Sequence, residues 1–235
     1  MTSPTSWLAD QARMLWNLQV TPEVIPNPYE PPPARTAPPR QRDEGPDRGL
    51  RILFLGMLQR RKGVFTLAEA LRSWFDARGE GTVTWVGQDN HWKADGAARI
   101  AAILGRHAQR CTFLPEQCGI SLNAAIRQAD LVVLPSFCDN APYSCVEAMA
   151  HARPVVTTTG SGTREFIIDR WNGILVPPGN APALTAALTE AAADRTAVRT
   201  LGENARRSLE LRLSPEQTTG RLCNAYSRLA GSPAD

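Results

Sequence analysis

The sequence lacks the patterns that mark a metal site, a disulfide framework or a membrane span. Its five cysteines include no Cys-x-x-Cys pair, and no histidine is spaced from them as a second ligand would be, so neither zinc nor disulfides are indicated. Reduced thiols in a cytosolic protein fit this cysteine usage. No apolar run approaches about 18 residues, so we expect no transmembrane helix. Residues 1–10 lack the basic region and apolar core of a secretory signal.

An excess of charge of one sign is also missing. The chain has 26 basic and 23 acidic residues and no block of lysine and arginine, so a nucleic-acid partner is not indicated. Its 43% hydrophobic and 21% charged residues are typical of a soluble globular protein.

Proline divides the sequence, because nine of the 19 prolines lie within residues 22–46. Residues 29–49 combine proline with charge and show no apolar period, so we expect a linker there. Before it, apolar spacing predicts a helix within residues 5–18, and Val24-Ile25 allows only a short extended piece. We therefore divide the chain into residues 1–30, a linker at 31–49 and a main domain at 50–231.

From Arg51 onward, apolar strands alternate with helices. Strands are predicted at residues 52–55, 82–86, 111–114, 131–134, 154–158 and 173–176. Helices are predicted at residues 64–75, 97–107 and 122–129, from about residue 143, and at 182–193, 196–211 and 215–229. This alternation predicts an α/β protein whose Rossmann-like, doubly wound parallel sheet is covered by helices on both faces.

Two carboxylates follow the strand at 131–134. Asp139 lies in the polar turn after Pro135-Ser136, and Glu147 lies eight residues later on the predicted helix. Ligands bind at the carboxyl ends of strands in open parallel sheets. The pair suits acid/base work, a glycosidase-type carboxylate pair or a carboxylate that holds ribose hydroxyls. A turn-stabilising Asp139 and a solvated Glu147 are the alternatives without function.

A basic turn bounded by glycines follows the first strand of the main domain. Residues 56–63 read GMLQRRKG and connect that strand to a helix. Glycine permits close backbone approach, the helix start offers unpaired N–H groups, and Lys62 adds a positive charge, so the turn suits a phosphate. The spacing of a Walker loop is missing, and a solvated basic turn remains the alternative.

A third turn, residues 159–165, follows the strand at 154–158 and reads TGSGTRE. Its glycines and hydroxyls suit an anion or a sugar. The favoured interpretation is structural, with Glu165 capping the helix that starts there and Ser161 or Gly162 at the N-cap.

Several motifs stand in order along this domain. They are Gly-x-Leu-x-x-x-Lys-Gly at 56–63, an acidic residue separated by seven residues from a glutamate at 139–147, Glu-Ala-Met-Ala at 147–150, Arg-Pro-Val-Val at 153–156, Gly-x-x-Glu at 162–165 and Asn-Gly-Ile-Leu-Val-Pro-Pro-Gly at 172–179. From Arg51 to about Leu229 the chain thereby resembles the C-terminal, nucleotide-sugar-binding half of GT-B glycosyltransferases of family 4. Residues 139–143 look most like members that build envelope polysaccharide and lipopolysaccharide.

The resemblance implies retaining transfer of a sugar from a UDP- or GDP-linked donor, without a metal or other cofactor. It implies that Glu147 holds the ribose hydroxyls, that Lys62 neutralises the departing pyrophosphate and that Asp139 lies near the donor sugar. Asp139 and Lys62 are thus the expected catalytic residues, and the backbone N–H groups of Asn140 and Ala141 would face the phosphate or the sugar. The full expected donor-binding set is Gly56, Arg61, Lys62, Asn140, Ala141, Glu147, Gly162 and Glu165.

Two residues depart from the family pattern. Met57 stands where many members carry an arginine that clamps phosphate, and Arg60 or Arg61 are the candidates to replace it. Asp139 stands where glutamate is common, so its carboxylate is one methylene shorter. Both departures bear on turnover more than on binding.

The family's acceptor-binding half is not in this sequence, although residues 5–28 resemble its end. We therefore expect a donor half that is inactive or nearly so alone, either as a fragment, as a truncated reading frame or as one subunit of a split enzyme. Its expected partners are a nucleotide sugar and either a separate acceptor-domain chain or a second copy, because Leu222, Tyr226 and Leu229 would leave an apolar face on the last helix. We expect a cytoplasmic protein with peripheral contact at the inner face of the membrane. A non-catalytic nucleotide-sugar-binding or assembly subunit and a GT-B nucleotide-sugar epimerase are the alternatives.

Overall fold

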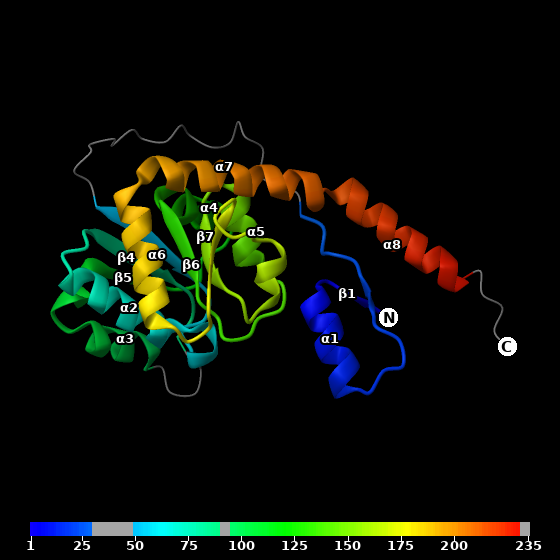
Figure 1. The fold of residues 1–235 in the computed structure, drawn as a ribbon, viewed down its shortest axis with the longest axis horizontal. Helices are drawn as coiled ribbons and strands as arrows, with labels where there is room; N and C mark the ends of the chain where they lie inside the picture. Colours follow the sequence, from blue (N-terminus) through cyan, green and yellow to red (C-terminus); the bar gives the residue numbers. More distant parts are fainter. Residues whose placement is uncertain (30–48, 90–94, 231–235) are drawn as a thin grey trace.

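The computed structural model describes residues 1–29, 49–89 and 95–230. The linker predicted at 31–49 therefore lies outside the described residues, apart from Gly49. The described chain forms one α/β unit, with an N-terminal segment beside it and a last helix that extends beyond the sheet (Figure 1).

A six-stranded parallel sheet forms the centre of the main domain. Its strands are β3 (Leu50–Leu55), β4 (Gly81–Val86), β5 (Cys111–Leu114), β6 (Leu131–Leu134), β7 (Val155–Thr158) and β8 (Gly173–Val176). They lie in the order β5-β4-β3-β6-β7-β8, and each pairing is parallel. In register, Ile52 of β3 lies between Val83 of β4 and Leu131 of β6. The predicted doubly wound sheet is confirmed.

Helices connect these strands and follow the last one. The α-helices of the main domain are α2 (Val64–Asp76), α3 (Gly96–Leu104), α4 (Gly119–Gln128), α5 (Tyr143–Ala150), α6 (Ala181–Ala193), α7 (Arg195–Arg212) and α8 (Pro215–Ala230). Short 3₁₀ turns are η2 (Arg60–Lys62), η3 (Gly105–Arg110) and η4 (Gly162–Glu165). The helices that apolar spacing predicts are present, although α3 ends at Leu104 and continues as η3.

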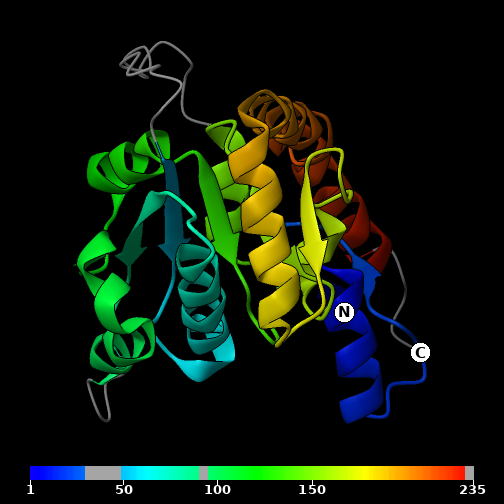
Figure 2. The same cartoon turned by 60° about the vertical axis from the view of Figure 1, so that its left-hand side comes forward.

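Both faces of the sheet are buried, which explains why its strands are continuous apolar runs. Leu131 and Val133 of β6 pack into the cluster that includes α2, α3 and α6. Val132 and Leu134 point to the other face, in the cluster with α4, α5 and α7. Figure 2 shows α6 and α2 crossing in front of the strands, with α7 on the far side.

The N-terminal segment forms a small unit of its own. It contains the two-residue parallel strands β1 (Thr2–Ser3) and β2 (Glu23–Val24) and the helix α1 (Ser6–Leu15). The helix α8 contacts this unit, since Arg221 Nη2 donates to the Val24 carbonyl at 2.5 Å and Arg228 pairs with Glu23 at 2.6 Å. The last helix is therefore tied to residues 1–29.

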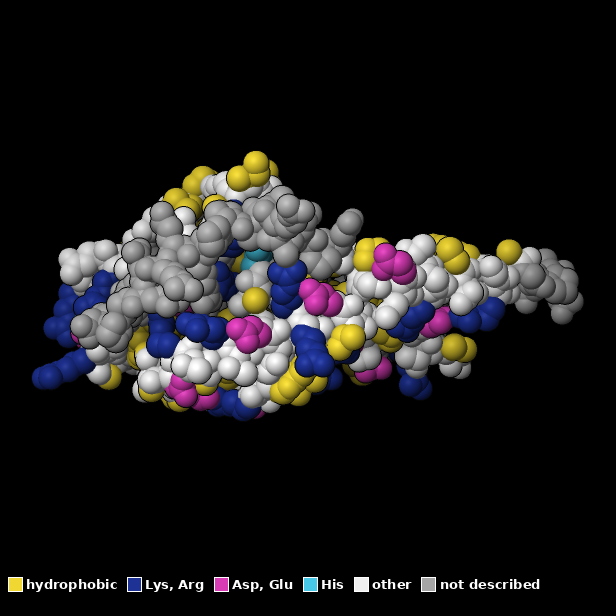
Figure 3. All heavy atoms as spheres, turned by 90° about the horizontal axis from the view of Figure 1, so that it is seen from above, with side chains coloured by type: hydrophobic (Ala, Val, Ile, Leu, Met, Phe, Trp, Pro, Cys, Tyr) yellow, Lys and Arg dark blue, Asp and Glu magenta, His cyan; other side chains and the backbone are white. Residues whose placement is uncertain are grey.

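Within the part of the chain that the structure describes, we find no helix that is both long and apolar enough to cross a lipid bilayer. The face that carries α7 and α8 mixes basic, acidic and apolar side chains (Figure 3). Some of these opposite charges form ion pairs, such as Arg206 with Glu210 at 2.8 Å.

Candidate functional site

The strand order changes direction between β3 and β6, and the candidate site lies at this point. β4 and β5 follow β3 toward one edge, while β7 and β8 follow β6 toward the other. At such a switch point the connecting segments diverge and leave a crevice at the carboxyl ends of the strands. The turns that leave β3 and β6 are residues 56–63 and 135–142, which are two of the turns that the sequence singles out.

Close backbone contact holds these two turns together. Gly63 has φ of 72°, and a Cβ atom there would lie 1.9 Å from the Pro135 carbonyl oxygen. Phe137 N–H donates to the Arg61 carbonyl at 2.9 Å. Only glycine fits at position 63, because the left-handed φ and the close approach both exclude a side chain.

Lys62 and Asp139 meet across the switch point. Lys62 Nζ lies 2.5 Å from Asp139 Oδ2, and the two side chains are only 16% and 13% exposed. Ser136 Oγ and the Asn140 N–H each donate to the Asp139 carboxylate at 3.2 Å. Charge-assisted bonds of this kind are roughly twice as strong as neutral ones, so the pair fixes both turns. A bound anion would share Lys62 with Asp139.

Arg61 is the second cation at this place, and Met57 lies nearby in the same turn. The Arg61 guanidinium lies 3.9 Å from Asp139 Oδ1 and donates to the Cys138 carbonyl at 3.3 Å. Its side chain is 48% exposed and so remains accessible to a ligand. Met57 is half-buried, and its sulfur accepts from Gln59 Nε2 at 3.7 Å. Arg60 is exposed.

Glu147 is half-buried on α5 among buried neighbours, including Val146 and Ala148. Its carboxylate accepts no hydrogen bond from the part of the chain that the structure describes. Burial raises the pKa of Glu147 above its usual value because the charged form is poorly solvated. A partly buried carboxylate without a donor is poised to accept hydroxyl hydrogen bonds from a ligand.

Two neighbours complete this side of the site. Burial, with the Glu147 charge second, raises the pKa of Tyr29 to about 12. Tyr29 N–H donates to the Leu213 carbonyl at 3.2 Å, which holds the ring beside the apolar cluster that contains Ala141. Burial, with the Asp139 charge second, raises the pKa of Cys145 to about 12. Cys145 is therefore a protonated core thiol rather than a nucleophile.

The turn after β7 packs directly on the turn after β6. Gly162 N–H donates to the Asp139 carbonyl at 2.8 Å. A Cβ atom at Gly162 would lie 1.8 Å from the Asn140 carbonyl oxygen, so this glycine is required by space. Gly162 thus supports the residues that were expected to contact the donor.

Glu165 lies at the start of α1. Its carboxylate accepts from Ser6 N–H at 2.9 Å, Ser6 Oγ at 2.8 Å and Trp7 N–H at 2.8 Å. Ser161 stands at the N-cap of η4, as one of the two expected residues, although its side chain makes no capping hydrogen bond there. The expected cap by Glu165 of its own turn is wrong, because both of its carboxylate oxygens bond to the start of α1 instead. Glu165 caps a helix that begins some 160 residues earlier in the chain, because that helix offers free N–H groups. A contact of Glu165 with the donor stays a prediction.

Of the other expected residues, Gly56 has φ of 140° and lies against the Lys62 side chain. Asn140 and Ala141 are half-buried at the mouth of the turn after β6. The structure thus brings Gly56, Lys62, Asp139, Asn140 and Gly162 together. Their roles in binding and catalysis stay predictions.

Sequence reasoning missed Thr5 and Tyr29. Thr5 is fully buried, and its Oγ1 donates to Asn140 Oδ1 at 2.9 Å. Both residues lie in residues 1–30, far in sequence from the motifs, and no periodic signal links them to the turns. Thr5 has one local signal, because threonine is a favoured N-cap residue, and its hydroxyl accepts from Leu8 N–H.

Comparison with known proteins gives the class of the chain. In doubly wound α/β folds, ligands bind at the switch point of the sheet, which is where Lys62 and Asp139 meet in this chain. The family model described as "Glycosyl transferases group 1" matches residues 49–194. The chain belongs to this family.

Individual relatives agree with the assignment. A D-inositol 3-phosphate glycosyltransferase of Salinispora arenicola is 33% identical over 189 residues, which is 77% of this chain and 42% of that protein. The chain thus spans less than half the length of this relative.

Solved structures show the same fold. HepE of Anabaena, solved in complex with UDP, matches 97% of this chain and 63% of its own with a TM-score of 0.81 and 22% identity. The C-terminal domain of a group 1 glycosyltransferase (LpcC) of Francisella tularensis matches 72% of this chain and 88% of its own, with a TM-score of 0.63 and 19% identity. At these identities the similarity shows the Rossmann-like fold of GT-B glycosyltransferases.

Proposed function

We propose that the chain is the C-terminal, donor-binding half of a family 4 GT-B glycosyltransferase. In this proposal it binds a UDP- or GDP-linked sugar at the switch point, and the sugar passes to the acceptor with retention of its anomeric configuration. The observation that carries the proposal is the meeting of Lys62 and Asp139 at the switch point. The half-buried carboxylate of Glu147, which accepts no hydrogen bond from the described residues, adds to it. Membership of the glycosyltransferase family supports it.

The residues divide the work by charge. Lys62 neutralises the diphosphate as it leaves, without a metal ion, and Arg61 adds a second positive charge. Stabilising such developing charge is an electrostatic task, and one well-placed donor is worth about 2.7–4 kcal/mol. Asp139 lies against the donor sugar, the N–H groups of Asn140 and Ala141 face the sugar or the phosphate, and Glu147 holds the ribose hydroxyls. The UDP bound to HepE supports UDP as the first nucleotide to test.

The acceptor half belongs to the proposal as a partner. The relatives are longer than this chain, and an acceptor domain in the same or a separate chain would close the crevice. We propose an envelope polysaccharide, lipopolysaccharide or glycolipid as acceptor and a cytoplasmic location with peripheral membrane contact. The five cysteines, each a free thiol, agree with that location.

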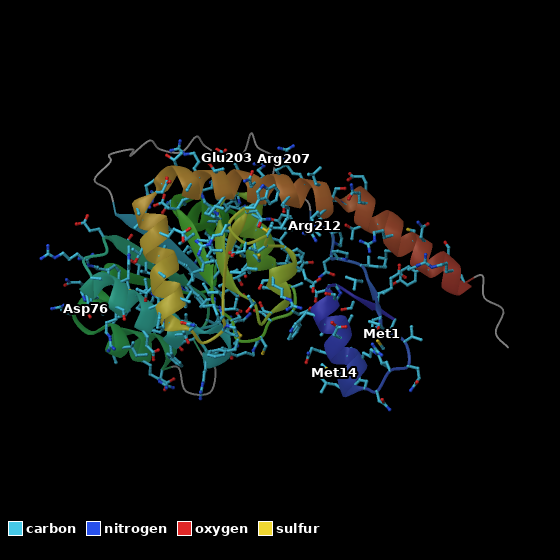
Figure 4. The ribbon with its side chains drawn as sticks, in the orientation of Figure 1. Met1, Met14, Asp76, Glu203, Arg207 and Arg212 are labelled. Carbon is cyan, nitrogen blue, oxygen red and sulfur yellow. The ribbon has the colours of Figure 1, made fainter. Side chains whose placement is uncertain are left out.

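Calorimetric titration with UDP, GDP, UDP-glucose and GDP-mannose tests the donor site. We expect one nucleotide series to bind and Lys62→Ala to weaken it about 10- to 100-fold, because a hydrogen bond to a charged group contributes about 1.5–3 kcal/mol. Glu147→Ala should also weaken binding of that nucleotide series. Glu203→Ala and Arg207→Ala, on the outer face of α7 (Figure 4), are matched charge-removing controls that should leave affinity unchanged.

Two results would contradict the proposal. If no nucleotide binds, or if Lys62→Ala and Glu147→Ala bind as wild type does, the site assignment is wrong. If the isolated chain transfers sugar at full rates without an added acceptor domain, its description as a donor half is wrong.

Met57 favours a second candidate function. An apolar side chain occupies the position where a phosphate-clamping arginine is common, which suits a subunit that binds nucleotide sugar without transferring it. Adding an acceptor domain separates the two candidates. Transfer that rises on Met57→Arg indicates a weakened enzyme, whereas binding without transfer in every pairing indicates the non-catalytic subunit.

A further inference from the structure

Three segments that are distant in the sequence meet at Asn140. Thr5, at the start of α1, is fully buried and donates from Oγ1 to Asn140 Oδ1 at 2.9 Å. Gly162 approaches so closely that its Cβ position would lie 1.8 Å from the Asn140 carbonyl oxygen and 3.1 Å from Thr5 Oγ1. The Asn140 side chain is therefore held by Thr5, and its backbone packs against Gly162.

The bond from Thr5 determines the orientation of the Asn140 amide. Thr5 Oγ1 accepts from Leu8 N–H at 3.2 Å, and its single hydrogen goes to Asn140 Oδ1. With its oxygen turned toward Thr5, the amide directs Nδ2 away from it. This Nδ2 finds no acceptor among the described residues, although Asn140 is half-buried. The two N–H donors of Nδ2 are thus available on the residue that follows Asp139.

The start of α1 is itself firmly anchored. Glu165 accepts hydrogen bonds from Ser6 and Trp7. The carbonyl of Glu165 accepts from Arg212 Nη1 at 2.9 Å, so the end of α7, where Figure 4 labels Arg212, supports the same turn. The N-terminal segment therefore cannot shift without moving the turn that carries Asn140.

We propose that Thr5 is a positioning residue of the donor site. By fixing the Asn140 amide, it aims Nδ2 at a hydroxyl of the donor sugar, next to the hydroxyl contacts of Asp139. This inference rests on the proposed function, and it makes the first turn of α1 part of donor recognition. It assigns the Asn140 side chain to the sugar, since the charged Lys62 serves the diphosphate.

The test compares Thr5→Val, which removes the hydroxyl and keeps the shape, with Thr5→Ser, which keeps the hydroxyl. The ligands are whichever of UDP-glucose and GDP-mannose the wild-type chain binds more tightly, and the matching diphosphate without sugar. We expect Thr5→Val to weaken the sugar nucleotide about fivefold to tenfold, leave the diphosphate unchanged and be rescued in Thr5→Ser. Thr218→Val is the matched control, because Thr218 is 3% exposed and its hydroxyl donates to the carbonyl of Ser214, the residue before α8, at 2.9 Å.

Thr5→Val also removes the N-cap of α1, so a second variant separates stability from positioning. Asn140→Ala leaves that cap intact and should weaken the sugar nucleotide as much as Thr5→Val does. The double variant should bind no worse than Asn140→Ala alone, because both changes remove the same contact with the sugar. Thermal unfolding of each variant confirms that the titrated protein is folded.

Several outcomes would overturn the inference. These are unchanged sugar-nucleotide affinity in Thr5→Val, equal loss for the diphosphate, or additive losses in the double variant. If wild type binds the diphosphate and the sugar nucleotide while Thr5→Val has no effect, the inference alone fails. If wild type binds neither, the proposed function fails and the inference falls with it.

Discussion

Glu147 combines a cost in stability with a proposed task in binding. A carboxylate that is half-buried without a donor destabilises the folded chain when it is charged. Ligand-binding residues often show this conflict, because the site is arranged for the ligand rather than for the empty protein. Removing the charge of Glu147 should therefore stabilise the folded chain, which is not expected for a solvated surface glutamate.

We therefore predict that Glu147→Gln stabilises the chain at neutral pH. The folded-state pKa of Glu147 is raised above that of the unfolded chain. Below about pH 4.5 the carboxyl group is protonated in both the folded and the unfolded chain, so wild type and variant should have similar free energies of unfolding. As the pH rises through the raised pKa, the wild type loses stability relative to the variant. We expect a higher melting temperature for the variant at pH 7.5, with about 2–4 °C for each kcal/mol in a chain of this length.

Thermal unfolding at pH 7.5 and near pH 4 checks this prediction. Glu210→Gln is the control, because Glu210 is exposed and paired with Arg206 at 2.8 Å, and its loss should not raise the melting temperature. A Glu147→Gln variant that melts at or below the wild-type temperature at pH 7.5 would refute the account of an unpaired charge.

At the scale of elements, the site depends on three turns that pack backbone to backbone. The turn after β3 packs on the turn after β6 through Gly63, and the turn after β7 packs on it through Gly162. Each glycine removes a side chain where two main chains must approach. The helices and strands bring these turns to one edge, and the glycines set the distances between them.

We predict that Gly162→Ala destabilises the chain by about 1–3 kcal/mol, because the added methyl group overlaps the Asn140 carbonyl. Gly220→Ala is the matched control. A Cβ atom at Gly220 meets nothing within 4 Å, and alanine favours the α8 helix by up to about 1 kcal/mol. Denaturant unfolding of both variants tests the contrast. Equal effects of the two substitutions would show that the contact between the turns is dispensable.

The elements themselves were predictable from the sequence, whereas several contacts of the site were not. Continuous apolar runs such as 131–134 predict buried parallel strands, and strand–helix alternation predicts their winding. The place of Lys62 and Asp139 at one edge follows from that topology. The bond from Thr5 to Asn140 joins residues 135 apart, and the cap from Glu165 to Ser6 joins residues 159 apart. Such single long-range hydrogen bonds leave no periodic trace in a sequence.

At the scale of the whole molecule, the exposed apolar surface expected on α8 is found in part, and a larger exposed group lies elsewhere among the described residues. Of the α8 residues expected to be exposed, Tyr226 is 63% exposed, whereas Leu222 is partly covered where α8 meets residues 1–29. The side chain of Leu229 lies outside the described residues. A larger group lies at the end of α1 and the turn after it, where Met14, Leu15, Trp16 and Val20 are each at least 65% exposed.

We predict that this α1 surface drives association of the isolated chain. Clustered apolar side chains on a monomer mark a contact with another protein surface. Light scattering should show the apparent mass rising with concentration, and Leu15→Ser with Trp16→Ser should suppress that rise. Ile120→Ser is the control, because Ile120 is 87% exposed but lies alone on α4. A wild-type chain that stays monomeric at high concentration would contradict the prediction.

The capping of α1 by Glu165 bears on where this protein can be divided. A cut within the proline-rich stretch falls at the boundary that the sequence predicts. Residues 1–29 would still be bound to the rest of the chain through the Glu165 cap, the bond from Thr5 to Asn140 and the arginines of α8. The first 29 residues, supplied as a separate peptide, would then rejoin the larger piece as a complementing fragment. Because the bond from Thr5 also holds Asn140, binding of the peptide to the larger piece would show whether the turn after β6 has its native conformation.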